Sequence, residues 1–199
     1  MSNAFLDAIT ARRSIYAIGK NVKLSEDQIA TLVKEAVKHS PSSFNSQSSR
    51  VVVLFGKQHE KLWNIIKETL RKIVPAEAFA TTETKLASFA AGRGTVLFFE
   101  DTQVIDVLQK QFAAYADNFP IWSEHSTGIA QFAVWSTLAQ EHIGATLQHY
   151  NPLIDHEVKS TWNLPDSWKL RAQMPFGSIE QAAGEKSFIS DDERFRVFK

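Results

Sequence analysis

The stretch STGIAQFAVWSTLAQEH, residues 126–142, decides how this chain folds. Apolar and small side chains occupy nearly every face of a helix drawn through it, so no broad polar stripe is left for solvent. A helix of that kind is buried all round, either in a core or in an interface between chains. We therefore expect a long helix here, with the other elements packed around it.

Four further runs predict strands, and most of the remaining chain has helical periodicity. Asn3 is a candidate N-cap for a first helix, and Ser25 with Gln28 forms a capping box for a second. The run at residues 50–55 is β-branched and short, which indicates a buried strand, and Gly177 is expected to end the last strand. Helices are expected at 3–12, 25–37, 62–73, 77–91, 104–112, 126–142 and 154–162, and strands at 50–55, 95–99, 145–149 and 168–174.

The order of these elements favours a mixed α+β fold. It lacks the regular strand–helix alternation and the Gly-x-Gly-x-x-Gly turn of a doubly wound nucleotide-binding domain. A length of 199 residues suits one domain over residues 1–199. Residues 181–199 are polar with few apolar side chains, so this tail either stays mobile or packs on another surface.

Composition excludes several classes of function. The chain has 22 basic and 22 acidic residues, so no overall field attracts nucleic acid or a membrane surface. It has no cysteine, which excludes disulfides and thiolate metal sites and fits a cytoplasmic location. The apolar runs are too short to span a bilayer, and the N-terminal residues do not resemble a signal peptide. We expect a soluble protein without nucleic-acid or membrane partners.

Three segments are candidate binding elements. Arg12-Arg13-Ser14 places two guanidinium groups and a hydroxyl at a helix end, which suits phosphate capture; the alternative is a solvated helix end. The loop at residues 41–49 has five serines and two amides that can bond a heterocycle, or it is an ordinary connection. In an extended tail, Arg194 and Arg196 share one side, although on this pattern alone a docked tail with surface charge is the favoured explanation.

Other catalytic devices are missing from the sequence. No histidine pair has metal-ligand spacing, and there is no Gly-x-Ser-x-Gly elbow and no glycine-rich phosphate loop with lysine. We therefore expect the protein to have no metal site and to supply no catalytic side chain.

Taken in order, four motifs resemble the FMN-dependent nitroreductase superfamily. They are Arg12-Arg13-Ser14, Pro41-Ser-Ser-Phe-Asn-Ser-Gln47, Gly94-Thr-Val-Leu-Phe-Phe-Glu-Asp101 and Arg194-x-Arg196. The likeness is greatest to the short subgroup of fungal and bacterial nitroreductase-like proteins. It implies an α+β fold with a central, mostly antiparallel sheet flanked by helices. It also implies a homodimer with a long buried interface helix and a C-terminal arm that reaches onto the partner.

The resemblance assigns the cofactor-binding residues. Arg12 and Arg196 would hold the FMN phosphate, with Arg194 in support and Arg13 and Ser14 along the phosphate, ribityl chain or pyrimidine edge. Lys85 would lie near the pyrimidine carbonyl. The remaining residues would meet the ring system, the first four from the opposite subunit and the last three near flavin N5: Ser42, Ser43, Asn45, Gln47, Leu147, Gln148 and His149.

The resemblance also implies the activity. FMN would accept hydride from NAD(P)H at N5 and pass it to a small-molecule acceptor such as a nitroaromatic or quinone by a ping-pong mechanism. One departure concerns N5, where Gln148-His149 replaces the Glu-Gly pair of many larger members. Two other hypotheses remain. The chain is a flavin-binding protein for storage, sensing or regulation with little turnover, or it is a flavin-free interaction domain.

Overall fold

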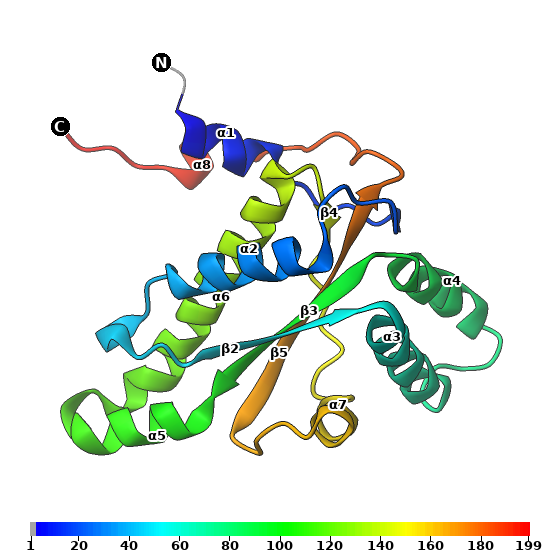
Figure 1. Cartoon of the computed structure of the whole chain (residues 1–199). Coiled ribbons are helices and arrows are strands. Elements are labelled where there is room, and N and C mark those ends of the chain that lie inside the picture. The colour runs from blue at the N-terminus through cyan, green and yellow to red at the C-terminus, as the bar shows by residue number, and fades with distance from the viewer. Residues whose placement is uncertain (1–2) are drawn as a thin grey trace.

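A central antiparallel sheet with helices on both faces forms the body of the protein, as seen in a computed structural model that describes residues 3–199 (Figure 1). The strand order is β1-β5-β3-β2, and β4 pairs separately with β5. All these pairings are antiparallel. The prediction of an α+β fold with an antiparallel sheet is confirmed. The strands are β1 (Ile18–Gly19), β2 (Ser49–Phe55), β3 (Gly94–Asp101), β4 (Gly144–Ala145) and β5 (Trp168–Ile179).

The first helices begin where local signals in the sequence place them. The Asn3 side chain accepts hydrogen bonds from the first turn of α1, and Ser25 and Gln28 form the predicted capping box of α2. The helices are α1 (Ala4–Ala11), α2 (Glu26–Lys38), α3 (Gly56–Arg71), α4 (Phe79–Ala90), α5 (Thr102–Gln111), α6 (Phe119–Gln140), α7 (Asp155–Trp162) and α8 (Asp191–Arg194), with two 3-10 helices, η1 (Ser43–Asn45) and η2 (Ala113–Asn118).

The sheet separates two apolar cores. α2 and α6 cover one face, and α3, α4 and α7 cover the other (Figure 1). β3 is buried over its whole length because both of its faces are covered. Its side chains alternate, so that Val96 and Phe98 enter the first core while Leu97 and Phe99 enter the second.

A bulge in β5 changes which face its side chains occupy. Phe98 pairs with Ala172, but the next residue, Phe99, pairs with Leu170, so Arg171 is the additional residue. Ala172 therefore enters the first core and Leu170 the second. Arg171 forms an ion pair with Glu124 of α6.

β2 is an edge strand, and the prediction of a fully buried strand at residues 50–55 is wrong. Only Leu54 is buried, because β2 pairs with β3 alone and ends the sheet. Composition identified the strand but not its position in the sheet, since an apolar β-branched run fits both a central and a covered edge strand.

The prediction that Gly177 ends the last strand is also wrong, since β5 continues to Ile179. Gly177 pairs with Gly144 of β4, and a Cβ atom added to it would lie 2.1 Å from the backbone oxygen of Gly19. The glycine therefore admits a close approach of two backbones. The strand predicted at 145–149 is shorter than expected, with β4 at its start and one isolated bridge from Gln148 to Gln173.

The helix predicted at 126–142 begins earlier, at Phe119, and is not buried all round within one chain. Ala130, Val134 and Leu138 face the core, whereas Gly128 is exposed and Ile129 is 43% exposed. Its outward face, which also carries the exposed Glu124 and His125, is left uncovered by the rest of residues 3–199. Among the helices of residues 3–199, none combines the length and the apolar content that crossing a bilayer requires.

One histidine is buried within the fold, with a hydrogen-bond partner at each ring nitrogen. His59 is 1% exposed; its Nε2 contacts the Ala90 carbonyl oxygen at 3.1 Å, and its Nδ1 lies 2.8 Å from the Thr95 hydroxyl. The Trp63 indole donates to the same hydroxyl at 3.0 Å. Nε2 therefore carries the proton and Nδ1 accepts from Thr95. Burial is the main reason that the pKa of His59 is lowered.

We expect the protein to lose stability as the pH falls below about 6.5, the pKa of histidine in an unfolded chain. A lowered pKa in the folded state means that the unfolded chain binds the proton more readily, so acid favours unfolding. Thermal unfolding of wild type and His59→Gln, followed between about pH 7.5 and 5, tests this. His59→Gln should show the flatter pH dependence, and the exposed His156→Gln serves as the control. Equal pH dependence in all three proteins would contradict the assignment.

Candidate functional site

The end of α1 opens into a pocket that brings together the first predicted motif and the start of the tail. Arg12, Arg13 and Ser14 follow α1 directly. The pocket has a volume of about 510 Å³ and is lined by residues 12–17 on one side and 181–186 on the other. Its charged side chains are those of Arg12, Arg13, Lys186 and Glu185, so positive charge prevails.

Arg12 has the features of an anion-binding residue. Its guanidinium carbon lies 4.4 Å from the centroid of the Trp135 ring of α6, and its Nε is buried and has no hydrogen-bond partner among residues 3–199. Within residues 3–199, neither Arg12 nor Arg13 forms an ion pair with a carboxylate. Burial, and then the neighbouring charge of Arg13, lowers the pKa of Arg12. A buried donor with no partner, next to a second positive charge, suits an anionic group.

Hydrogen bonds fix this segment against the sheet. Arg13 donates from Nη2 to the Gly184 carbonyl oxygen at 2.6 Å, which joins the two walls of the pocket. Ser14 forms a bridge with Ala145, and the N–H of Ile15 donates to the Ala145 oxygen at 3.0 Å. The Trp135 indole donates to that same oxygen at 3.1 Å. The motif is thus tied to both β4 and α6.

The segment predicted to face flavin N5 leaves this region along β5. Leu147 packs against the first core, and Gln148 is 8% exposed with its Nε2 donating to Thr146 Oγ1 at 3.1 Å. Gln148 also exchanges backbone hydrogen bonds with Gln173. His149 is the exposed member of the three. Of this segment, His149 is exposed, Leu147 is half-buried and Gln148 is buried.

Lys85 lies on the same side of the molecule as the pocket. It is exposed on α4, with its Nζ 5.9 Å from the Phe89 ring centroid. Phe89 also contacts Tyr16, at 6.2 Å between ring centroids, and Tyr16 lines the pocket. Sequence analysis did not identify Tyr16, because no local pattern distinguishes it from a surface aromatic residue.

The serine-rich loop, residues 41–49, lies at the other end of the sheet. Ala145, beside Ser14, pairs with Phe176, which pairs with Gly94 at the start of β3. Ser49, at the end of the loop, pairs with Glu100 at the far end of β3. Six residues of strand separate the two sites, a distance of about 20 Å. Within one chain, therefore, Ser42, Ser43, Asn45 and Gln47 do not meet Arg12.

This loop has an unusual backbone. Phe44, Asn45 and Gln47 have positive φ angles of 56°, 50° and 47°, a conformation that costs non-glycine residues about 1–3 kcal/mol each. The Phe44 ring packs against an aromatic cluster, with the Phe112 and Phe119 centroids at 4.9 and 5.2 Å. Such strain persists only where the surroundings fix it, and it is concentrated at functional sites.

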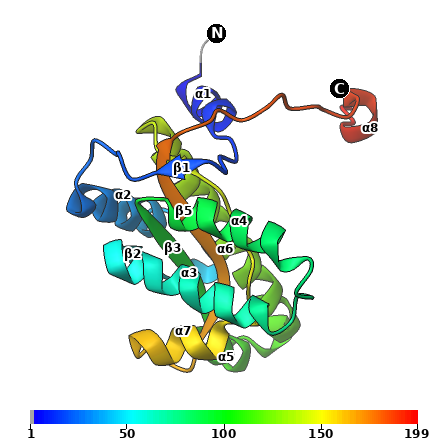
Figure 2. The same ribbon diagram turned by 90° about the vertical axis from the view of Figure 1, so that its right-hand side faces the viewer.

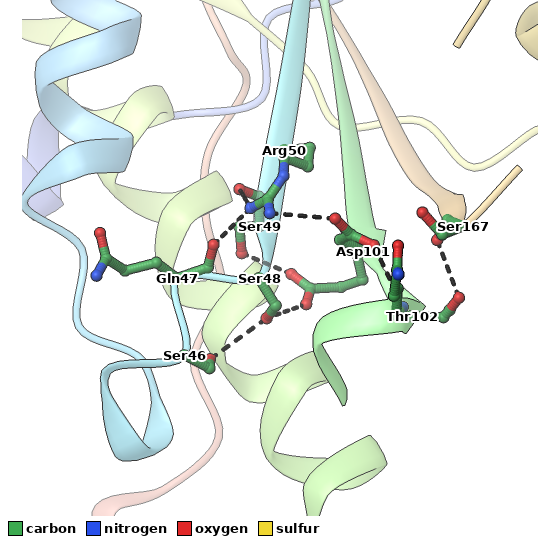
Figure 3. Close-up of polar contacts among 10 residues, drawn as sticks. Ser46, Gln47, Ser48, Ser49, Arg50, Asp101, Thr102 and Ser167 are labelled. Carbon is green, nitrogen blue, oxygen red and sulfur yellow. Dashed lines mark hydrogen bonds and ion pairs between the residues drawn. The ribbon is translucent and has the colours of Figure 1, made fainter. Parts of the chain in front are cut away.

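Two consecutive acidic residues hold the end of the loop. Arg50 donates to Asp101 Oδ2 at 3.1 Å and to the Gln47 carbonyl oxygen, and the N–H of Asp101 donates to the Ser48 oxygen at 2.9 Å (Figure 3). Glu100 is 1% exposed and accepts hydrogen bonds from Ser48 and Ser49 at 2.5 Å each. Sequence analysis missed Glu100, although a carboxylate within a buried strand is itself a signal, because it requires partners.

The C-terminal arginines do not reach the Arg12 pocket in the single chain. Figures 1 and 2 together show α8 well away from α1. Arg194 ends α8, so the prediction of a fully extended Arg194-Phe-Arg196 segment is wrong. The three acidic residues that begin α8 favour a helix N-terminus, and the N–H of Phe195 closes the turn on Asp191 at 2.8 Å. Arg196 is exposed.

The fold and the Arg12 pocket define a class of protein: an α+β protein with a pocket of mainly positive charge at one end of an antiparallel sheet. Residues 9–178 match the model of the nitroreductase family. The chain belongs to this family of oxidoreductases.

Relatives cover nearly the whole chain. HBN1 of Saccharomyces cerevisiae is 34% identical over 94% of both chains. The crystallised nitroreductase CinD from Lactococcus lactis, in complex with chloramphenicol, is 50% identical, with a TM-score of 0.91 over 98% of this chain and all of that one. A nitroreductase with bound FMN from Desulfitobacterium hafniense shares the fold, with a TM-score of 0.72 over both full chains at 14% identity.

Proposed function

We propose that the protein is an FMN-dependent oxidoreductase that works as a homodimer. The observation that carries the proposal is the buried, unpartnered Nε of Arg12 beside Arg13 in a pocket of mainly positive charge. The FMN phosphate matches the chemistry of this donor set. Family membership and the FMN found in a protein of the same fold support the choice of cofactor.

Each residue of the pocket would have a different role in binding FMN. Arg12 and Arg13 would bind the phosphate, with the Ser14 hydroxyl as a neutral donor next to them. Trp135 holds the Arg12 guanidinium in place through its ring. Lys85 would supply positive charge from α4 on the same side. The tail continues directly from the pocket wall at 181–186, so its docking in a dimer would let Arg194 and Arg196 add charge to the site.

The second part of the site would come from the partner. Because the Arg12 pocket and the serine-rich loop lie at opposite ends of β3, one chain offers two half-sites that cannot combine with each other. A twofold dimer would place the Asn45 and Gln47 side chains of one subunit beside the Arg12 pocket of the other. This accounts for a loop whose two amide side chains, those of Asn45 and Gln47, are exposed in the single chain.

Bound FMN would supply the redox chemistry, accepting hydride from NAD(P)H and reducing a nitroaromatic, quinone or similar acceptor in alternating half-reactions. The protein would bind and orient the reactants and stabilise negative charge with Lys85 and the arginines. The test is to record the visible flavin spectrum of the purified protein and then follow nicotinamide oxidation with a quinone and with a nitroaromatic. Bound flavin without turnover would favour the storage or sensing alternative, and a colourless protein that binds no added FMN would refute the proposal.

We expect Arg12→Ala to raise the FMN dissociation constant by about 10- to 100-fold, the range for losing a charge-assisted hydrogen bond. Titration of the apoprotein by flavin fluorescence measures this. Arg71→Ala is the matched control, because it removes an exposed arginine that also stacks on an aromatic ring, Phe79, but lies outside the pocket. If both variants bound FMN equally, the phosphate assignment would be wrong.

A further inference from the structure

We propose that Glu100 is a positioning residue for the flavin site, because its carboxylate fixes the loop at residues 42–47 through Ser48 and Ser49. The inference rests on the proposed function, in which this loop meets the flavin held by the other subunit. Glu100 itself contacts no part of the Arg12 pocket, since it lies at the far end of β3. Its effect on the flavin would therefore be indirect.

The carboxylate joins three elements. Its Oε2 accepts from Ser48 Oγ, and its Oε1 accepts from Ser49 Oγ and from Thr127 Oγ1 of α6. No cation among residues 3–199 pairs with it, since Arg50 pairs with Asp101. A buried charge without a counter-ion is tolerated only where hydrogen bonds satisfy it, and here three hydroxyl groups do so. Both serines belong to the end of the loop.

Stability alone does not explain a carboxylate at this position. The four residues that precede it in β3, Val96 to Phe99, are apolar and fully buried, and an apolar side chain of similar size would avoid the cost of burying a charge. The side-chain bonds of Glu100 go to Ser48, to Ser49 where the loop enters β2, and to Thr127 of α6. The carboxylate therefore sets the position of the loop relative to α6, the helix whose outward face is left uncovered.

The loop itself needs such a support. Phe44, Asn45 and Gln47 occupy the left-handed region, yet the side chains of Asn45 and Gln47 stay exposed. Phe44 is held by the aromatic cluster, and Gln47 by its N–H, which donates to Ser42 Oγ at 2.9 Å. Glu100 holds the two serines that come next in the chain. A strained loop fixed at both ends, with free amide side chains between them, is a preorganised binding element.

The test compares Glu100→Ala with Glu100→Gln in the full-length protein. Alanine leaves three hydroxyl groups without their acceptor. Glutamine keeps the shape and one acceptor oxygen, and its amide can donate to Ser48, whose proton can turn to Ser46 Oγ at 3.4 Å. We expect Glu100→Ala to raise the FMN dissociation constant by about tenfold, and Glu100→Gln to restore it to within about threefold of wild type. Flavin fluorescence titration measures both, with the dimer checked by sedimentation.

Two further variants separate positioning from loss of stability. Ile66→Ala truncates a fully buried side chain in the second core, away from the loop, and should lower Tm without changing FMN affinity. Ser49→Ala removes one of the three bonds and should give an intermediate loss of FMN affinity. It takes the place of Glu100→Ala if that variant does not fold. Wild type that binds no FMN would refute the proposed function. Wild type that binds FMN, with Glu100→Ala and Ser49→Ala binding equally well, would refute the positioning role alone.

Discussion

A Gly177→Ala variant is expected to lose about 3 kcal/mol or more of its free energy of unfolding, which lowers Tm by roughly 6–12 °C in a domain of this size. The added Cβ would lie 2.1 Å from the Gly19 carbonyl oxygen and 3.1 Å from the Arg93 nitrogen. Both are backbone atoms, so no side chain can rotate away. Relief requires β1 to separate from β5.

The same change should also weaken the flavin site. β1 follows directly on residues 12–17, which line the Arg12 pocket, and within residues 3–199 it pairs with β5 alone. Displacing β1 therefore displaces the segment that carries Arg12. Thermal unfolding and FMN titration of the same preparation measure both effects.

Gly184→Ala is the matched control for stability, because a Cβ added there meets nothing within 4 Å. Its Tm should stay within about 2 °C of wild type, as for a surface substitution. A Gly177→Ala protein with the wild-type Tm would contradict this prediction. It would mean that β1 and β5 can move apart enough to admit the Cβ atom without loss of stability.

Signals that act within a few residues could be read from the sequence, and contacts between distant segments could not. The caps of α1 and α2 were predicted because the capping side chain and the N–H groups it bonds are near neighbours in the chain. β1 was missed because two residues carry no periodicity. Gly177 was misread as a strand end, since its real role depends on Gly19, which lies far away in the sequence.

The residues of the candidate site divide in the same way, into those with a local signal in the sequence and those that depend on contacts between distant segments. Arg12, Arg13 and the serine-rich loop were found because their composition is unusual for their surroundings. Nothing in the sequence pointed to Trp135 or to the pocket wall at 181–186, because their roles arise only when α6 and the tail are brought beside α1. For Glu100 the sequence showed a charge in a buried strand, but the hydroxyl groups that satisfy it come from two other elements.

The exposed face of α6 connects the fold to the proposed site. Ile121 and Ile129 are 53% and 43% exposed, and the small Gly128 lies two turns from Ile121 on the same side of the helix, with the exposed Glu124 and His125 between them. The other large apolar side chains that stay exposed include those of the tail, such as Phe188 at 72%. An apolar helix face with a small residue suits close packing against an identical helix. A dimer formed through α6 would cover this face and join the two half-sites.

An Ile129→Arg variant is therefore expected to be monomeric at concentrations where wild type is dimeric, because an unpaired charge would be buried between the two α6 helices. The cost of such a charge corresponds to a dimer dissociation constant raised on the order of 100-fold or more. FMN affinity should fall with it, since the monomer keeps the Arg12 pocket but loses the partner's loop. Sedimentation velocity and FMN titration measure the two effects.

Ile73→Arg is the matched control, because Ile73 is 56% exposed at the end of α3, on the opposite face of the sheet from α6. It adds the same charge and should change neither the dimer dissociation constant nor the FMN affinity. The two readouts also separate the parts of the proposal. A monomer with unchanged FMN affinity would mean that one chain binds the cofactor completely and that the serine-rich loop has another role. A dimer that persists in Ile129→Arg would mean that the subunits meet through a surface other than α6.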